Sequence, residues 1–69
     1  MSQADKICEY LRRGNSITQA EAAEMFGCWR LGARILELRR AGMPIETTMI
    51  RQTNEEGEIT RYARYWLRK

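Results

Sequence analysis

The sequence contains no histidine, and its two cysteines, Cys8 and Cys28, do not have the spacing of a metal-binding pair. Asp5 is the only aspartate, and the glutamates are scattered along the chain. No acid–base pair, serine nucleophile with a base, or glycine-rich phosphate loop can be recognised. We therefore expect no catalytic activity, no cofactor, no metal and no small-molecule substrate.

Long apolar segments are also missing. No apolar run approaches the roughly 20 residues that a helix needs to span a bilayer, so we expect neither a signal peptide nor a membrane partner. A cytoplasmic protein is the expectation that follows. The sequence has no linker, repeat or low-complexity segment, and its 69 residues suffice for one small domain. One domain over residues 1–69 is therefore predicted.

Positive charge is present but unevenly distributed. Residues 1–27 carry three basic and four acidic side chains, whereas residues 28–53 carry five arginines against two glutamates. Residues 54–58 add three glutamates, and residues 59–69 add four basic side chains and no acid. A polyanion would meet the second and the last of these segments, which favours nucleic acid as the partner. The alternative is an ordinary solvated surface of mixed charge.

Two short helical patterns lie between residues 18 and 42, with a break of a few residues between them. Apolar positions recur at helical spacing in both: Ala20, Ala23 and Phe26 in the first, and Leu31, Ile35 and Leu38 in the second. Gly27 falls in the break, where glycine lets a helix end in a left-handed turn. A second helix held across a first, with arginines on its outer face, can enter the major groove of DNA.

Local signals set the expected helix boundaries. A first helix is predicted over residues 3–13, where a glycine and an asparagine follow. Thr18 begins a T-x-x-E capping box, so the second helix is expected over residues 19–26. The third is expected over residues 29–41, because Gly42 can end it and a proline follows two residues later.

After Pro44 the apolar period changes from 3.6 to 2, which predicts a β-hairpin. Pairing of Ile45 with Leu67 gives an inner face that contains Ile45, Met49, Ala63, Tyr65 and Leu67. A slip of one residue exchanges the two faces. Because a lone hairpin is marginal in water, it must pack on the helices. The predicted fold class is therefore α+β: a three-helix helix-turn-helix core followed by a hairpin wing, the winged-helix arrangement.

The pattern R-L-x-A-R-I-x-x-L-R-x-x-G over residues 30–42 carries a family resemblance, supported by I-T at 17–18, I-E-T at 45–47 and an aromatic-basic strand at 61–65. With these motifs the chain resembles the small winged helix-turn-helix proteins of bacteriophages and prophages. The resemblance implies DNA binding, in transcription regulation or as an excisionase-like architectural factor. Two features depart from the pattern: Gly32 stands where alanine is common, and the hairpin tip is acidic.

The candidate DNA-binding residues lie on the third helix, at the start of the second, and along the hairpin. Arg30 and Arg34 are the leading candidates for base reading, because a bidentate arginine–guanine contact is the commonest specific one in the major groove. The alternative for both is a solvated helix face with an ion pair to Glu37. The complete predicted set is Thr18, Gln19, Trp29, Arg30, Ala33, Arg34, Glu37, Arg40, Arg51, Arg61 and Arg64.

Tyr62 and Trp66 are expected on the outer face of the hairpin, where two large aromatic side chains exceed what solvation needs. They predict an interface, most simply of a homodimer or a cooperative assembly on DNA. An alternative function is a protein-interaction module, or an inhibitor of a host protein, that uses the same fold without DNA. The acidic tip favours that alternative, and the arginines of the third helix favour double-stranded DNA.

Overall fold

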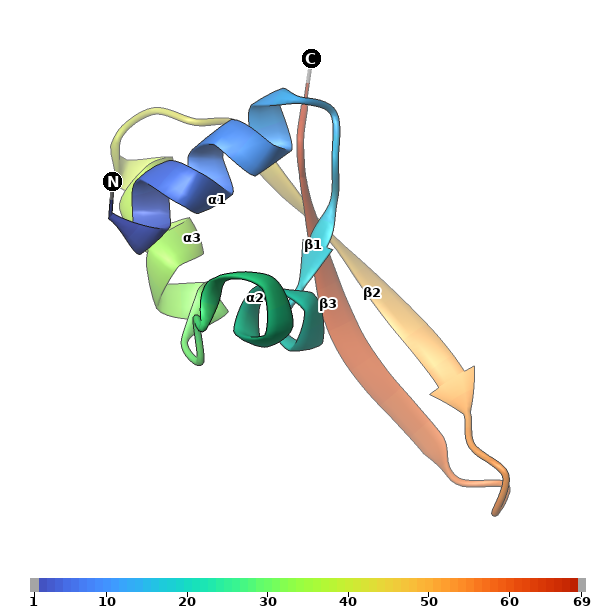
Figure 1. The fold of residues 1–69 in the computed structure, drawn as a ribbon. Coiled ribbons are helices and arrows are strands. Elements are labelled where there is room, and N and C mark those ends of the chain that lie inside the picture. Colours follow the sequence, from blue (N-terminus) through green and yellow to red (C-terminus); the bar gives the residue numbers. More distant parts are fainter. Residues whose placement is uncertain (1, 69) are drawn as a thin grey trace.

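The structure, a computed structural model, describes residues 2–68. Three helices pack together, and a long hairpin projects from them (Figure 1). The elements follow the order α1 (Gln3–Arg12), β1 (Ile17–Thr18), α2 (Gln19–Phe26), α3 (Leu31–Arg40), β2 (Ile45–Thr53) and β3 (Ile59–Leu67). The α+β winged-helix architecture predicted from the sequence is therefore confirmed. In the described part of the chain, every helix is too short or too polar to cross a membrane.

Capping boxes begin the first two helices. The Thr18 hydroxyl accepts a hydrogen bond from the Glu21 amide at 3.2 Å, and the Glu21 carboxylate accepts one from the Thr18 amide at 2.9 Å. This is the box predicted for α2. Ser2 and Asp5 form the same reciprocal pair at the start of α1. In each case two backbone amides that lack a partner within the helix are satisfied.

The third helix begins later than predicted. It covers Leu31–Arg40 rather than residues 29–41. Arg30 is its N-cap with φ −127° and ψ 62°, so neither Trp29 nor Arg30 lies on the helix. The expectation that both residues sit on the helix face was wrong, and they belong to the turn that precedes it.

Contacts across the helix-turn-helix explain this late start. Gly27 ends α2 in the left-handed region with φ 63°, as its position in the break predicts. The Gln19 side chain then accepts a hydrogen bond from the Leu31 amide at 2.8 Å and donates one to the Cys28 carbonyl at 2.7 Å. Because Gln19 satisfies the first amide of α3, the helix starts at Leu31 and the two preceding residues stay in the turn.

The end of α3 follows the prediction closely. Gly42 adopts φ 100° beyond the last turn. Its amide donates to the Arg39 carbonyl at 3.0 Å, and the Met43 amide donates to the Leu38 carbonyl at 3.1 Å. These two bonds form a Schellman motif, which satisfies carbonyls that α3 leaves open.

The sheet contains one strand more than predicted. β2 and β3 pair with Ile45 opposite Leu67, which decides between the registers that the sequence left open. β1 pairs with the other edge of β3, where Ile17 lies opposite Tyr65, so the strand order is β1-β3-β2. A strand of two residues is too short to show a period of two, which is why the sequence pattern indicates only an extended segment there.

The hydrophobic core lies between the three helices and the root of the sheet. Its buried apolar members are Ile7, Leu11, Ile17, Ala22, Cys28, Leu31, Ile35, Leu38 and Ile45. Met49 lies on the predicted inner face of the hairpin but is 60% exposed. Its expected burial was therefore wrong. Much of the hairpin extends beyond the helices (Figure 1), so residues there have no helix to pack against. The result is an elongated molecule of about 40 × 25 × 19 Å.

Candidate nucleic-acid interface

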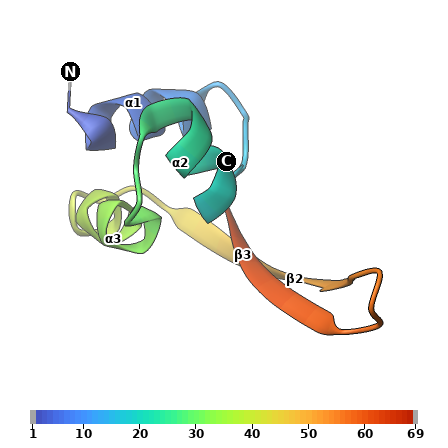
Figure 2. The same cartoon turned by 60° about the horizontal axis from the view of Figure 1, so that its bottom comes forward.

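The outward face of α3 is fixed by its buried side. Leu31, Ile35 and Leu38 point into the core, so the opposite side of the helix faces solvent. Its exposed members are Ala33, Leu36, Glu37 and Arg40. Figure 2 shows α3 and the hairpin on one side of the molecule and α1 on the other. A long partner that touches α3 can therefore also touch the hairpin.

Trp29 and Arg30 flank this face at the start of α3. Trp29 is 79% exposed, so it does not fold back over α2. Arg30 is exposed too. Both side chains therefore remain available to a partner at the N-terminal end of α3, although the helix itself does not carry them.

Arg34 forms the ion pair with Glu37 that the sequence left as an alternative. Its Nη1 lies 2.5 Å from a carboxylate oxygen of Glu37, and its Nε donates to Gln3 Oε1 at 3.4 Å. Surface ion pairs contribute about 0–1 kcal/mol. This one is partly exposed on both sides, so a phosphate or a base edge can replace Glu37 at little cost.

Thr18 and Gln19 have structural roles at the start of α2. The Thr18 hydroxyl caps the helix, and this residue is only 6% exposed. Gln19 connects α2 to the start of α3 through its two side-chain hydrogen bonds. Both polar groups already have partners within the protein. A phosphate at this end of α2 would therefore be bound through the backbone amides, since helix N-termini bind anions.

The arginines of the hairpin divide into two groups, and the first consists of Arg51 and Arg61. These residues lie directly opposite each other on β2 and β3. Both are exposed, and within residues 2–68 neither belongs to an ion pair. Like charges directly opposite each other in a sheet are unfavourable. An anion bound between them would relieve that repulsion.

The face of the hairpin that carries this pair also faces α3. Arg39 of α3 donates to the Ile45 carbonyl at 2.9 and 3.1 Å and to Thr47 Oγ1 at 2.8 Å. Side chains alternate between the two faces of a strand, so Thr47 and Arg51 share a face. Four residues of strand separate them by about 13 Å. The arginine pair thus extends the basic surface of α3 along the hairpin.

The second group of hairpin arginines is held by internal partners. Arg64 Nη1 donates to Ser16 Oγ at 2.9 Å and lies 3.2 Å from the carboxylate of Glu21. Arg68 lies 3.2 Å from Glu46. The predicted phosphate contact of Arg64 therefore competes with a network that joins β3 to the start of α2.

Tyr62 and Trp66 lie on the opposite face of the hairpin, as predicted. Trp66 is 39% exposed and its Nε1 donates to Thr48 Oγ1 at 2.9 Å. Tyr62 is half-buried and lines a groove of about 420 Å³ between the start of α2 and the hairpin. Trp66 thus contacts the neighbouring strand β2, and Tyr62 lies beside the start of α2, so both are less exposed than their positions in the sequence indicate.

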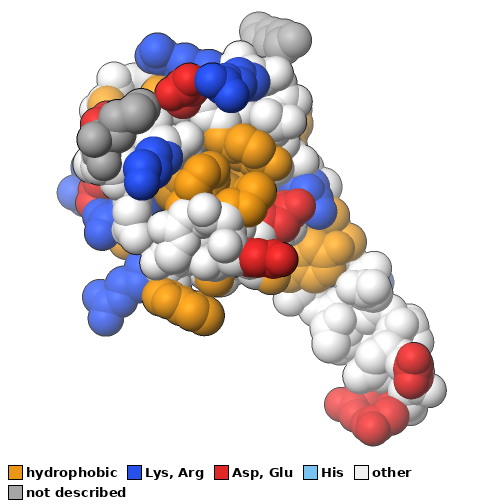
Figure 3. Space-filling view, viewed as in Figure 1, with side chains coloured by type: hydrophobic (Ala, Val, Ile, Leu, Met, Phe, Trp, Pro, Cys, Tyr) orange, Lys and Arg blue, Asp and Glu red, His pale blue; other side chains and the backbone are white. Residues whose placement is uncertain are grey.

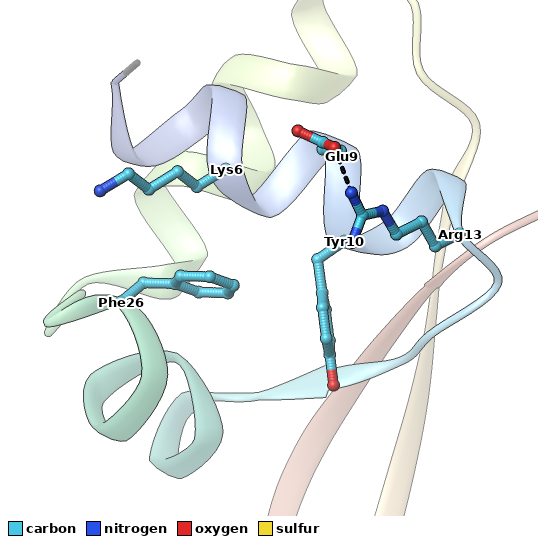
Figure 4. Close-up of a pocket in the computed structure, with 5 residues that line it drawn as sticks. All are labelled: Lys6, Glu9, Tyr10, Arg13 and Phe26. Carbon is cyan, nitrogen blue, oxygen red and sulfur yellow. Dashed lines mark hydrogen bonds and ion pairs between the residues drawn. The ribbon is translucent and has the colours of Figure 1, made fainter.

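A shallow apolar hollow lies on the helical side of the molecule (Figure 3). Tyr10 and Phe26 meet there edge to face, with ring centroids 5.7 Å apart. Lys6, Glu9 and Arg13 complete the lining of this hollow of about 180 Å³ (Figure 4). Among residues 2–68 no group of three or more potential metal ligands forms. The contact between the Tyr10 and Phe26 rings explains the apolar lining of this hollow.

Leu36, which is 49% exposed on the outward face of α3, was not among the predicted site residues. Its exposure was predictable, because a residue five positions after buried Leu31 lies about 140° around the helix axis from it. Arg51 and Arg61 were predicted as separate contacts and not as a pair. Their juxtaposition follows from the hairpin register, which the structure establishes and the sequence left open.

Comparison with known proteins agrees with this geometry. No curated protein and no solved structure matched the chain. A family model described as a winged helix-turn-helix domain matches residues 2–69. Such a domain is typically a non-catalytic fold, and it suggests double-stranded DNA as the partner. By its helices, its hairpin and this nearly complete match, the chain belongs to the winged helix-turn-helix domain family.

Proposed function

We propose that this protein binds double-stranded DNA sequence-specifically, with α3 in the major groove and the hairpin strands on the backbone. The observation that supports this most directly is the Arg51–Arg61 pair, on the hairpin face shared with α3. The pair lies about 13 Å beyond the contact between α3 and Thr47. The major groove is about 12 Å wide, so a hairpin of this reach meets the phosphates that border a groove filled by α3.

Base reading is assigned to the side chains around α3. Arg30 and Arg40 are exposed at the two ends of the helix, and Arg34 becomes available when its surface ion pair opens. Trp29 and Ala33 contact sugar or thymine methyl groups in this arrangement, and Glu37 orients Arg34 or accepts from a cytosine amine. Thr18 and Gln19 hold the start of α2 near the backbone, as the first helix of such a motif crosses it.

In the cell, the protein acts in this proposal as a transcription regulator or an excisionase-like architectural factor of a bacteriophage or prophage. The resemblance of residues 30–42 to that group of proteins supports the assignment. Its setting is the cytoplasm, where such DNA is found.

Salt dependence of binding tests the backbone contacts. A duplex selected from a random library by the wild-type protein serves as the probe. Each phosphate contact adds about 0.9 to the slope of log K against log salt. Arg51→Gln and Arg61→Gln should each lower this slope by about one unit and leave the preferred sequence unchanged.

Arg12→Gln provides the matched control. Arg12 is exposed and belongs to α1, the helix that Figure 2 shows on the other side of the molecule from α3 and the hairpin, and its replacement removes the same charge. The control should leave the slope unchanged. Equal effects of all three substitutions would show that only net charge matters, and failure to select any duplex would reject the proposed function.

A further inference from the structure

Leu36 stands out on α3 because it is large, apolar and half-exposed on a helix whose other long outward side chains are charged. It is 49% exposed, and Ala33 and Arg40 lie beside it on the same face. α3 carries three arginines and one glutamate, and that glutamate is paired with Arg34. The surroundings of Leu36 are therefore basic, and this favours a polyanion over an apolar protein surface as the occupant of this face.

The chemistry of leucine limits what it can recognise in a major groove. Its side chain has no hydrogen-bond donor or acceptor, so it cannot read the polar groups of the base edges. Among the four unmodified bases, the 5-methyl group of thymine is the apolar group that the major groove presents. Contact between Leu36 and this methyl removes apolar surface of both from water.

We propose that Leu36 is a specificity-determining residue that recognises a thymine through its 5-methyl group. The inference rests on the proposed function, since it requires α3 to lie in the major groove. It adds the chemical identity of one recognised base and a residue that reads it.

Deoxyuridine, which lacks only that methyl group, tests the inference. The probe is the duplex selected by the wild-type protein, with each thymine replaced by deoxyuridine, one position at a time. One buried methyl corresponds to about a fourfold change in affinity. Wild-type protein should lose about this factor at a position under α3. Leu36→Ala should bind the thymine duplex more weakly and show no response at that position, while Leu36→Met should keep the response.

Met25→Ala is the matched control, because Met25 is a 45% exposed apolar residue on α2. It should keep the full wild-type response. Folding of each variant is checked by thermal unfolding, and Leu36→Ala should fold because alanine favours helices and the side chain is half-exposed.

The outcomes separate this inference from the proposed function. A wild-type protein that selects no duplex rejects both. If the wild-type protein selects a duplex but binds every deoxyuridine-substituted version as tightly as the thymine duplex, the Leu36 inference alone is overturned. Leu36→Ala with the full wild-type response also overturns it, and a change in sedimentation of that variant would then assign Leu36 to a protein contact.

Discussion

Gly32 is a residue of α3 whose type the free protein does not explain. Its φ is not positive, and a Cβ built there would meet nothing within 4 Å. Glycine nevertheless costs a helix interior about 1 kcal/mol relative to alanine. Packing within residues 2–68 therefore does not require a glycine here. We propose that the glycine allows the backbone of α3 to approach a partner closely.

Gly32→Ala should therefore separate stability from binding. We expect the free energy of unfolding to rise by up to about 1 kcal/mol, which raises Tm by roughly 4–8 °C in a domain of this size. Affinity for the selected duplex should fall, because the added methyl group lies between helix and groove. Thermal unfolding by circular dichroism and fluorescence anisotropy measure the two quantities.

Gly42→Ala is the control with the opposite sign. Gly42 has φ 100°, where alanine is strained, so this variant should be less stable than wild type. A Gly32→Ala protein that gains both stability and affinity would contradict the close approach.

How far a residue's role can be predicted depends on how distant its partners are. The Thr18–Glu21 capping box was predictable because its partners are three residues apart. Arg64 was not, because its partners Ser16 and Glu21 are 48 and 43 residues away. Its sequence neighbours are basic and aromatic, which indicated a phosphate contact. The internal network becomes visible only when β1 is placed beside β3.

At the scale of elements, Gln19 joins the two helices of the motif. Gln19→Ala leaves the Leu31 amide and the Cys28 carbonyl without their present partner. An unsatisfied buried polar group costs about 1–3 kcal/mol, and these groups are only part-buried. The free energy of unfolding should therefore fall by about 1–2 kcal/mol. The Leu31 amide should also exchange its hydrogen faster, as measured by NMR.

Two other variants serve as comparisons for Gln19→Ala. Gln19→Glu keeps an acceptor for the Leu31 amide and places a negative charge at the start of α3, so its loss of stability should be smaller. Gln52→Ala, on the exposed outer part of the hairpin, should change stability by less than about 0.5 kcal/mol. Equal stability of the Gln19→Ala and Gln52→Ala proteins would show that Gln19 does not hold the motif together.

Element boundaries were predictable where the sequence carries a local stop or a regular period. The register of the hairpin was not fixed by the sequence, because a slip of one residue exchanges the two faces and the burial along both strands does not alternate regularly. The end of α3 followed from Gly42. The start of α3 did not, because Leu31 receives its cap from Gln19, 12 residues earlier, and the residues before it fit a helical pattern equally well.

At the scale of the whole molecule, charge is arranged along the hairpin. Acidic side chains gather at its tip (Figure 3), which contains Glu55, Glu56 and Glu58. The Arg51–Arg61 pair lies between this tip and the helices. Phosphates attract the pair and repel the tip, so we expect the tip to remain in solvent or to meet a protein.

Replacing all three tip glutamates with glutamine should raise affinity for any duplex modestly. The preferred sequence should not change, because the repulsion acts on phosphates and carries no base information. Competition binding at low and high salt measures both effects, and the gain should shrink at high salt. Loss of DNA binding would instead show that the carboxylates make a required contact, and would favour the protein-interaction function.

Assembly is the remaining prediction at this scale. Single modules of this size bury roughly 600–1,000 Å² on DNA, a small surface for specificity. We therefore expect two or more copies per site, with half-sites about 10–10.5 base pairs apart or multiples of that, and contacts through Tyr62 and Trp66. Sedimentation of saturated complexes should give at least two proteins per duplex. One protein per duplex would rule this out, and Trp66→Ala should reduce the number to one.

The short β1 strand has a mechanical consequence. It pairs with β3 only at Tyr65 and Arg64, so the hairpin beyond these residues is a ribbon of two strands with both edges unpaired. Such a ribbon behaves as a cantilever fixed at its root, where a small change in twist displaces Arg51 and Arg61 by a larger distance. In the proposed complex, the basic pair would thus follow duplexes of different groove width while α3 stays in place. Selection among binding sites would then depend on the shape and stiffness of the DNA as well as on its bases.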